Sequence, residues 1–262
     1  MHSRIVIAEK ERDGAAQNDT SSSHNLVIPT HNFVLASLPP SDLNQIVSSA
    51  KAVEIKAGDV IYENGDEIDY IYFPINSIVS AVAIMEDGST VEISMTGREG
   101  IVGIAALIGG GRPFHWTRVS VTGTALRVPT PTLQGLFYTR PGVSDGVLRA
   151  YRRVYTQICQ RSVCNVRHTL LQRLATWLLM VSDRIGSEQL PFTQEQIAQQ
   201  ISVRRAGVSV AASHLQGLHA ISYHRGSIVV KDRPVLEHMA CECYEILGQE
   251  FGGVQNLRGL IG

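Results

Sequence analysis

Residues 193–230 read TQEQIAQQISVRRAGVSVAASHLQGLHAISYHRGSIVV, and the order of the elements in this stretch decides the fold. Thr193 can accept a hydrogen bond from the first helical turn and Gln196 can reach back to it, so a capping box begins a helix here. A short turn at Ser202-Val203 leads to a second helix, expected from about Arg204 to Gly217. Spacings of three and four predict one buried face on each helix, formed by Ile197, Ala198 and Ile201 and by Val208, Ala211, Ala212 and Leu215.

The residues after Gly217 predict a two-stranded hairpin with a basic tip. Ile221-Ser222-Tyr223 and Ser227 to Val230 have strand-like composition, and His224-Arg225-Gly226 supplies the turn between them. Helix, turn, helix and ribbon in this order are typical of a winged helix-turn-helix. Gly207 in the second helix lowers helix propensity by about 1 kcal/mol relative to Ala, so we expect close packing or close approach at that position.

Charge placement favours double-stranded DNA as the partner of this unit. From Thr193 to Lys231 the only acid is Glu195, whereas the basic residues are Arg204, Arg205, Arg225 and Lys231. The whole chain has a net charge of −1, but a local excess is sufficient because affinity comes from counterions displaced at a few phosphates. A two-helix hairpin of an ordinary α-protein has the same spacing and is the alternative interpretation.

Composition is that of a globular protein with room for two modest domains: 262 residues, 44% hydrophobic and 18% charged. The longest nearly apolar run, Ile101 to Gly111, is too short and too rich in glycine to cross a bilayer. Charged residues at positions 9–13 occupy the place where a signal peptide would be apolar. We therefore expect a cytoplasmic protein with no membrane partner.

The cysteines fit a reducing compartment in which all four are free thiols: Cys159, Cys164, Cys241 and Cys243. No CxxC pair occurs, and no His-x-x-x-His lies near either couple. We therefore expect no metal site and no cofactor, and we assign these thiols a structural or incidental role. A metal site built from them is the alternative.

Residues 1–30 are polar and are expected to be a disordered tail. From Ala52 to about Pro129 the chain consists of short strand-like runs punctuated by Gly, Asp and Asn, with Asp87-Gly88 as a hairpin turn. The spacing predicts an antiparallel barrel or roll. The runs are Val60 to Tyr62, Tyr70 to Phe73, Ile78 to Met85, Thr90 to Met95, and Val119 to Val128.

After Pro141 the pattern becomes helical and basic. A three-four alternation predicts a coiled-coil seam that would pair with a second copy of the chain, while a core helix within one chain is the alternative. The seam residues are Leu148, Tyr151, Tyr155, Ile158, Ser162 and Asn165. A second helix, Thr169 to about Ser182, leads through Gly186 to the helix-turn-helix.

These patterns predict an α+β fold in four parts. A tail at 1–30 precedes a β-roll sensor domain at 31–145. The dimerisation helix and a connecting helix follow at 146–184, and the winged helix-turn-helix occupies 185–262.

In this order the parts resemble the Crp/Fnr family of bacterial transcription regulators. Gly58 to Asp66 with Tyr70 to Phe73 looks like the opening strands of a cyclic-nucleotide-binding-like roll. Phe192 to Ala198, followed by Val203-Arg204-Arg205 and Val208-Ser209, looks like the DNA-reading helices of the family. The resemblance implies a homodimeric, sequence-specific regulator on a palindromic operator, with RNA polymerase as a further partner. No Gly-x-Ser-x-Gly elbow, P-loop or metal triad indicates an enzyme.

Residues carried over from family members that bind cyclic AMP argue against that ligand. Gly103 is followed by Ile104 where such members have a glutamate for the ribose, and Trp116-Thr117-Arg118 replaces their Arg-Ser pair, which leaves Arg118 as the phosphate partner. Their adenine-binding Thr-Ser pair is matched by Ile158 and Cys159. The effector-pocket candidates are thus Gly103, Ile104, Arg118, Ile158 and Cys159, and nucleotide polar groups would stay unpaired among them.

Other effectors of the family leave one alternative open. No cysteine precedes Cys159, so the N-terminal iron–sulfur cluster of the oxygen-sensing branch has no ligands. His115 is a candidate axial ligand of haem. The alternative function is therefore a regulator switched by an unusual cyclic nucleotide or by a haem or gas ligand in the roll.

The resemblance also assigns the DNA contacts. Where the best-known members carry Arg-Glu and a later Arg, this chain has Arg205, Ala206 and Val210, so a different operator is expected. Arg204 and Arg205 would reach base edges and phosphates, with Ser209 in the same groove. Phosphates would be bound by Thr193, Gln194, Ser213, His224 and Arg225. A pure interaction protein, with the winged helix as a docking unit, is the remaining alternative.

Overall fold

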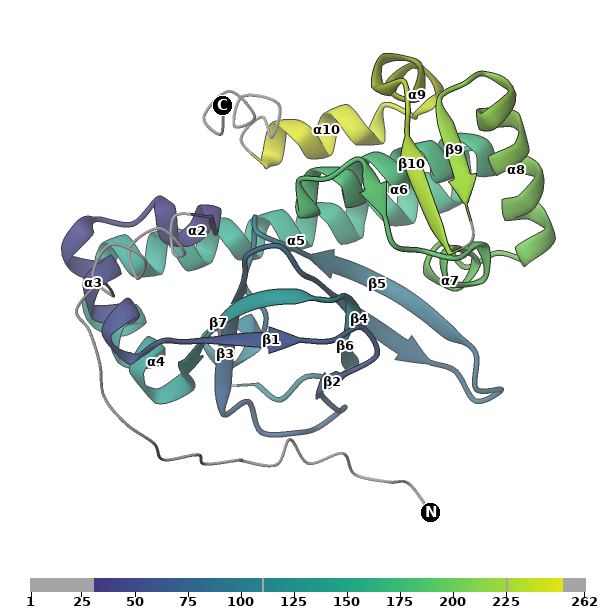
Figure 1. Cartoon of the computed structure of the whole chain (residues 1–262). Helices are drawn as coiled ribbons and strands as arrows, with labels where there is room; N and C mark the ends of the chain where they lie inside the picture. Colours follow the sequence, from purple (N-terminus) through teal and green to yellow (C-terminus); the bar gives the residue numbers. More distant parts are fainter. Residues whose placement is uncertain (1–30, 110, 225, 252–262) are drawn as a thin grey trace, which may run out of the picture.

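The computed structural model describes residues 31–109, 111–224 and 226–251 and confirms the α+β fold (Figure 1). A β-roll with flanking helices comes first, a long helix follows, and a helical unit with a small sheet ends the described chain. The predicted tail, 1–30, lies outside the described residues. None of the helices in the described ranges has both the length and the apolar composition needed to span a membrane.

Two antiparallel sheets form the roll. One has the order β1-β7-β3 and the other β2-β6-β4-β5. Between them lies a core in which Ile71, Phe73 and Val128 are buried. The strands are β1 (Lys51–Ile55), β2 (Val60–Tyr62), β3 (Tyr70–Pro74), β4 (Ile78–Ile84), β5 (Thr90–Thr96), β6 (Trp116–Val121) and β7 (Gly123–Pro129). The helices at their edge are α2 (Phe33–Ala36), α3 (Pro40–Ser49), the 3-10 turn η1 (Ile104–Ala106) and α4 (Thr130–Thr139).

The predicted strand positions are confirmed, with one correction. The run from Val119 to Val128 is two strands, β6 and β7, because the chain turns at Thr122-Gly123 to join the two sheets. A Cβ on Gly123 would lie 2.6 Å from Asn76 Oδ1, so only glycine fits this corner. The Asp87-Gly88 hairpin is confirmed by the Met85 N–H, which donates to the Ser89 carbonyl at 2.9 Å, and by a φ of 80° at Gly88.

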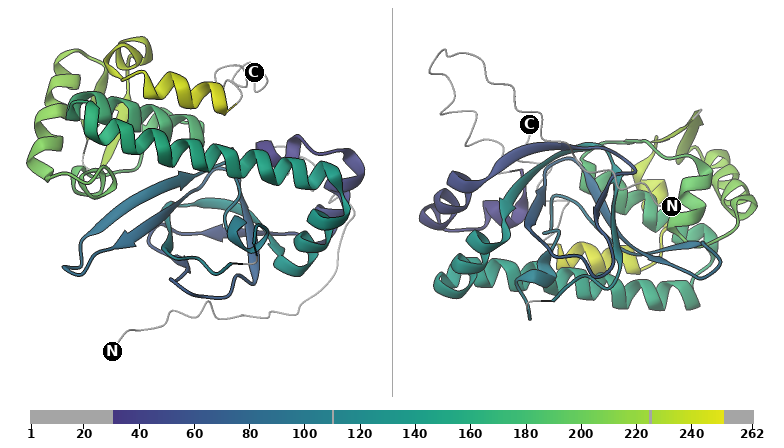
Figure 2. Two further views of the ribbon diagram at one scale, coloured as in Figure 1. Left: turned by 180° about the vertical axis from the view of Figure 1, so that it is seen from behind. Right: turned by 90° about the horizontal axis from the view of Figure 1, so that it is seen from below.

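Helix α5 (Pro141–Arg167) runs the length of the molecule behind the roll (Figures 1 and 2). Its inner face buries Val143, Val147 and Ala150, and the Gln157 side chain accepts a hydrogen bond from the Met95 backbone at 2.9 Å. The helix ends at His168, whose extended backbone (φ −107°, ψ 148°) forms the junction with α6 (Leu170–Ile185). Thr169 caps α6 at its N-terminus, and Gly186 in the left-handed region ends it. The helix was predicted from Thr169 to about Ser182, and it continues to Ile185.

The C-terminal unit surrounds α6. It contains α7 (Gln194–Gln200), α8 (Arg205–Gly217), a sheet of order β8-β10-β9, α9 (Arg233–Met239) and α10 (Cys243–Glu250). The strands are β8 (Gln189–Leu190), β9 (Ile221–His224) and β10 (Ser227–Val230). Helix α10 lies antiparallel along α5, because Cys243 contacts Gln160 whereas Glu250 contacts Arg152 (Figure 2).

Candidate DNA interface and ligand cavity

Helices α7 and α8 form the predicted helix-turn-helix. The Thr193 hydroxyl accepts from the Gln196 N–H at 3.2 Å and the Gln196 side chain accepts from the Thr193 N–H at 2.8 Å, so the capping box is present. The turn is closed by the Val203 N–H, which donates to the Ala198 carbonyl at 2.9 Å, and Ser202 adopts a φ of 54°. All seven apolar residues predicted to be buried are buried.

Gly207 brings α8 against the start of α6. A Cβ at this position would lie 2.7 Å from Leu170 Cδ2, closer than van der Waals contact allows. The expected close packing is therefore present, and its partner is another helix of the same chain. Position and tilt of α8 are thus coupled to the start of α6 through this contact.

The outer surface of α8 carries the predicted DNA-contacting side chains. Arg204, Arg205 and Ser213 are exposed, and Val210 between them is 74% exposed. Ser209 is half-buried and its hydroxyl donates to Gln194 Oε1 at 2.6 Å, which ties α8 to the start of α7. A polar surface with two arginines at the N-terminal end of a helix is suited to phosphates and base edges.

The remaining predicted contacts flank this surface. His224 is exposed at the end of β9, and pairing of His224 with Ser227 confirms the hairpin. Thr193 is half-buried and uses its hydroxyl in the cap. Arg225 lies outside the described residues. Arg204 also borders an open cleft between the helix-turn-helix and the β4-β5 hairpin, opposite Gly88 and Ser89.

A cavity of about 110 Å³ lies inside the roll and is closed on one side by α5. Gly103, Ile104 and Ile158 line it, as predicted, together with Tyr62 and His115. Among the described residues that line it there is no Arg, Lys, Asp or Glu. Pockets for drug-sized ligands have volumes of about 300–1,000 Å³, so this cavity is small and uncharged by comparison.

Two effector-pocket candidates do not reach this cavity. Arg118 lies on the opposite face of β6, because Thr117 holds the inward position and successive strand residues alternate. The Arg118 guanidinium stacks over Trp116 at 5.7 Å and borders the clefts beside α7. Cys159 is exposed on α5. Arg118 therefore has no access to a phosphate inside the roll, which corrects its predicted role.

His115 sits at the rim of the cavity. Its ring packs edge-to-face against Phe114 at 4.9 Å between centroids, and its Nδ1 is buried without a partner among the described residues. Burial lowers the pKa of His115. The imidazole is therefore neutral near pH 7, which adds no positive charge to the cavity.

Comparison with known families agrees with both parts of this geometry. Residues 52–140 match the family model of the cyclic nucleotide-binding domain, and residues 172–239 match that of the Crp-like helix-turn-helix domain. Together these matches cover more than half of the chain, in the order of a Crp/Fnr regulator. The chain belongs to the Crp/Fnr family. It is a transcription regulator with a DNA-binding helix-turn-helix, and not an enzyme.

Solved structures share the fold of this Crp/Fnr protein at low sequence identity. FixK2 from Bradyrhizobium japonicum has a TM-score of 0.64 at 16% identity, with 73% of this chain and 98% of that chain covered. A putative Crp/Fnr regulator from Eubacterium rectale has a TM-score of 0.61 at 14% identity, over 80% and 98%. The c-di-GMP-responsive regulator CLP from Xanthomonas campestris has a TM-score of 0.60 at 14% identity, over 73% and 99%. No curated protein sequence matches the chain.

The predicted seam of this Crp/Fnr chain forms a stripe on the outer face of α5. Leu148, Tyr151, Tyr155, Ser162 and Asn165 are exposed, and Ile158 is half-buried because its side chain also lines the cavity. Val166, which was not predicted, extends the stripe with 82% of its surface exposed. The alternative of an intramolecular core helix fits the opposite face of α5, which buries Val147 and Ala150.

The structure brings together one group of side chains that the sequence analysis did not join, since it considered the cysteines without His168. Cys164, His168, Cys241 and Cys243 offer ligand atoms that all lie within 4.8 Å of one another. A signal was present, since Cys164 and His168 are four residues apart and so share one helix face, but nothing in the sequence placed the distant Cys241-Glu242-Cys243 against them.

Proposed function

We propose that this Crp/Fnr regulator binds a palindromic operator as a homodimer through α8. The observation that carries the proposal is the combination, in one chain, of an exposed apolar stripe on α5 and an exposed Arg204-Arg205 pair at the start of α8. Two-fold pairing along α5 would present two copies of α8 to successive major grooves on one side of a duplex, about 34 Å apart.

The stripe supports pairing with a second copy because it is apolar, continuous and helical. Leu148, Tyr151 and Tyr155 recur at coiled-coil spacings of three and four, and each is about half exposed. Exposed apolar surface of this extent is uncommon on a monomer and marks an interaction site. Ser162 and Asn165 within the stripe would fix the register of the two helices at some cost in stability.

Within each half-site, Arg204 and Arg205 would reach base edges and phosphates. Thr193, Gln194, Ser213 and His224, with Arg225, would hold the flanking phosphates. Ser209 is held by Gln194 and, beside the exposed Val210, would contribute to shape readout.

A gel-shift titration against a pool of genomic fragments tests specific binding. We expect a small set of fragments to be retained at protein concentrations where the rest stay free, and we expect the retained fragments to share an inverted repeat. Equal affinity for all fragments at physiological salt, or no binding, would contradict the proposal. The location of the selected sites relative to promoters then shows whether the protein activates or represses.

An effector in the roll is a second part of the proposal, and the cavity supports a small uncharged molecule. Its lining holds no charged side chain among the described residues, and Arg118 faces away from it. Ile158 of the dimer helix lines the cavity, so a ligand there would contact the element that sets the dimer geometry and could shift the population of dimer states. Calorimetry with cyclic AMP and cyclic GMP should give no heat, and a binding isotherm with either nucleotide would favour the cyclic-nucleotide alternative.

The haem or gas alternative depends on His115, and it has its own test. Neutral imidazole with a buried, unpartnered Nδ1 at the rim of the cavity is compatible with an axial ligand. Haem added to the purified chain would then produce a sharp Soret band that His115→Gln removes. The 110 Å³ cavity is small for a macrocycle, so we expect no such band.

The proposed parts of the chain are the roll at 31–145, the dimerisation and connecting helices at 146–184, and the winged helix-turn-helix at 185–262.

A regulator of this kind works where promoters and RNA polymerase are found. We therefore place it in the cytoplasm of a bacterium, with RNA polymerase as a partner. Family membership supports this placement.

A further inference from the structure

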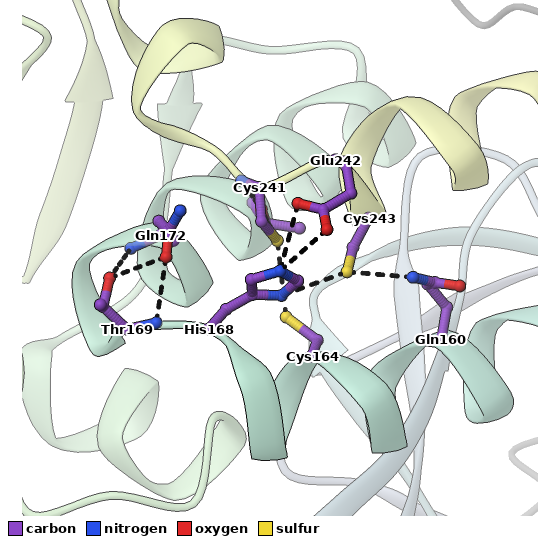
Figure 3. Close-up of polar contacts among 9 residues, drawn as sticks. Gln160, Cys164, His168, Thr169, Gln172, Cys241, Glu242 and Cys243 are labelled. Atoms are coloured by element: carbon purple, nitrogen blue, oxygen red, sulfur yellow. Dashed lines mark hydrogen bonds and ion pairs between the residues drawn. The ribbon is translucent and has the colours of Figure 1, made fainter.

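Three cysteines and one histidine meet where the end of α5 contacts the α9-α10 connection (Figure 3). Cys164 belongs to the last turns of α5, and His168 ends that helix. Cys241 and Cys243 flank Glu242, the N-cap of α10, and Cys243 is the first residue of that helix. The Cys164 and Cys241 sulfurs are 3.6 Å apart, and the Cys243 sulfur is 3.5 Å from His168 Nδ1. We propose that these four side chains bind a zinc ion in a tetrahedral Cys₃His site.

The distances fit a single tetrahedral ion. Zinc binds sulfur at about 2.3 Å and histidine nitrogen at about 2.0 Å, so tetrahedral ligand atoms lie about 3.5 to 3.8 Å apart. The two measured separations, 3.6 Å and 3.5 Å, have this size, and all six pairs lie within 4.8 Å. A two-iron cluster divides its ligands between two metal ions and needs a wider arrangement. Sulfur-rich tetrahedral sites with one imidazole are typical of structural zinc.

His168 is oriented as a ligand would be. Its Nε2 lies 3.1 Å from the Glu242 carboxylate, which accepts the Nε2 proton and leaves the Nδ1 lone pair directed at the sulfurs. Figure 3 shows the ring between Glu242 on one side and Cys164 and Cys243 on the other. A carboxylate that fixes the tautomer of a histidine is the usual support of a zinc ligand, and apolar packing of thiols has no need of it.

Hydrogen-bond donors surround the sulfurs. The Gln160 amide donates to Cys243 Sγ at 3.1 Å. Thr176 Oγ1 accepts from the Cys241 N–H at 3.2 Å and also lies 3.2 Å from Cys241 Sγ, to which its hydroxyl can donate. Such donors stabilise thiolates, the form in which cysteine binds metal. Three thiolates and Zn²⁺ leave one negative charge, and Arg173 lines the small cavity beside Cys164 and Cys243.

The position of the site assigns it a mechanical role. His168 is the extended residue between α5 and α6, so a metal bound to it fastens the hinge between the dimer helix and the DNA-binding unit. Leu170, two residues further on, is the contact of Gly207 in α8. Zinc would therefore hold α10 against α5 and, through His168 and Leu170, help to set the tilt of the DNA-contacting helix.

The test measures zinc in the full chain purified under reducing conditions, with Cys243→Ser as the ligand variant and Cys159→Ser as the matched control. Cys159 is an exposed cysteine on α5, the helix that carries Cys164, and lies outside the cluster. We expect one zinc per chain in the wild type and in Cys159→Ser, and at least a tenfold lower content in Cys243→Ser. Glu242→Gln keeps all four ligands and is expected to weaken zinc affinity by about 10- to 100-fold.

Two measurements on the wild type do not depend on how well a variant folds. Titration of the metal-free chain with Co²⁺ should produce the sulfur-to-metal charge-transfer bands and intense visible bands of a tetrahedral thiolate site. Because Cys164, Cys241 and Cys243 are buried, the second measurement compares rates of reaction with a thiol reagent: chelation should accelerate modification of these three and leave the rate at the exposed Cys159 unchanged.

Several results would overturn the assignment. These are wild-type protein that binds neither zinc nor Co²⁺, equal zinc in Cys243→Ser and Cys159→Ser, iron and sulfide in place of zinc, or a Cys164–Cys241 disulfide without metal. DNA binding is measured on the same samples. Zinc bound to a chain that does not bind DNA contradicts only the proposed function, and specific DNA binding by a chain that never holds metal contradicts only the zinc site.

Discussion

Arg161 on α5 forms an ion pair with Glu92 on β5, with Nη1 2.5 Å from Oε1. The second terminal nitrogen of the same guanidinium donates to the Gln200 carbonyl at the end of α7. The Glu92 side chain is only 2% exposed and also accepts from the Ser80 hydroxyl at 2.6 Å. One arginine thus joins α5, the roll and the helix-turn-helix.

Arg161→Ala is expected to destabilise the chain by about 3 kcal/mol, because it leaves the buried Glu92 carboxylate without its counter-charge. The free energy of unfolding from a urea titration measures this loss. Glu92→Gln in the Arg161→Ala background should recover part of it, since the buried negative charge is then removed as well.

Arg112→Ala serves as the control for the ion pair. Arg112 and Glu67 form a pair at 2.8 Å, but both side chains are mostly exposed. Exposed pairs contribute below about 1 kcal/mol. Similar losses in Arg112→Ala and Arg161→Ala would show that burial of Glu92 does not set the strength of the interdomain contact.

Arg205→Ala should weaken binding to a selected operator by about 1 to 3 kcal/mol and relax the sequence preference at one position of each half-site. The physical reason is loss of a guanidinium that can donate two hydrogen bonds to a guanine edge. Fluorescence anisotropy with the operator and with single-base variants measures both effects. Arg112→Ala removes an arginine from the roll and should leave affinity and preference unchanged. An Arg205→Ala chain that keeps full discrimination would assign base reading to other residues.

Local signals in the sequence predicted most of the fold. The capping box at Thr193 and the Asp87-Gly88 hairpin depend on residues at most four positions apart, so the sequence shows them directly. The buried faces of α7 and α8 follow from helical periodicity in the same way.

Contacts between distant segments could not be predicted in this way. Cys164 and Cys241 are 77 residues apart, and only the packing of α10 along α5 brings their sulfurs to 3.6 Å. The predicted role of Arg118 as the phosphate partner inside the roll was wrong, because Thr117 and not Arg118 faces the cavity. Strand side chains alternate, so a register error of one residue moves a side chain to the other face of a sheet. The pairings of β6 with β2 and with β4 each contain a register shift, and the sequence gives no sign of these shifts.

Tyr155→Glu should convert the proposed dimer to a monomer at micromolar concentration. Tyr155 is 58% exposed at the middle of the α5 stripe, and two-fold pairing would bury two carboxylates close together there. Sedimentation velocity measures the change. Tyr138→Glu is the matched control, since Tyr138 is an exposed tyrosine on α4, outside the stripe. A dimer that persists in Tyr155→Glu and dissociates in Tyr138→Glu would move the interface away from α5.

His115 is expected to make the roll sensitive to mild acid. Burial lowers its pKa in the folded chain, whereas the unfolded chain has the ordinary value of about 6.5. Below that value the unfolded state binds a proton that the folded state does not, so this histidine contributes a loss of stability as the pH falls, and the loss is absent well above pH 6.5. We therefore expect the difference between the free energies of unfolding at about pH 7.5 and about pH 5.5 to be smaller in His115→Gln than in the wild type. Urea titrations of both chains at the two pH values measure it. An identical difference in the two chains would mean that His115 binds its proton equally well in the folded roll, and that the cavity rim is open enough to hydrate a charged imidazole.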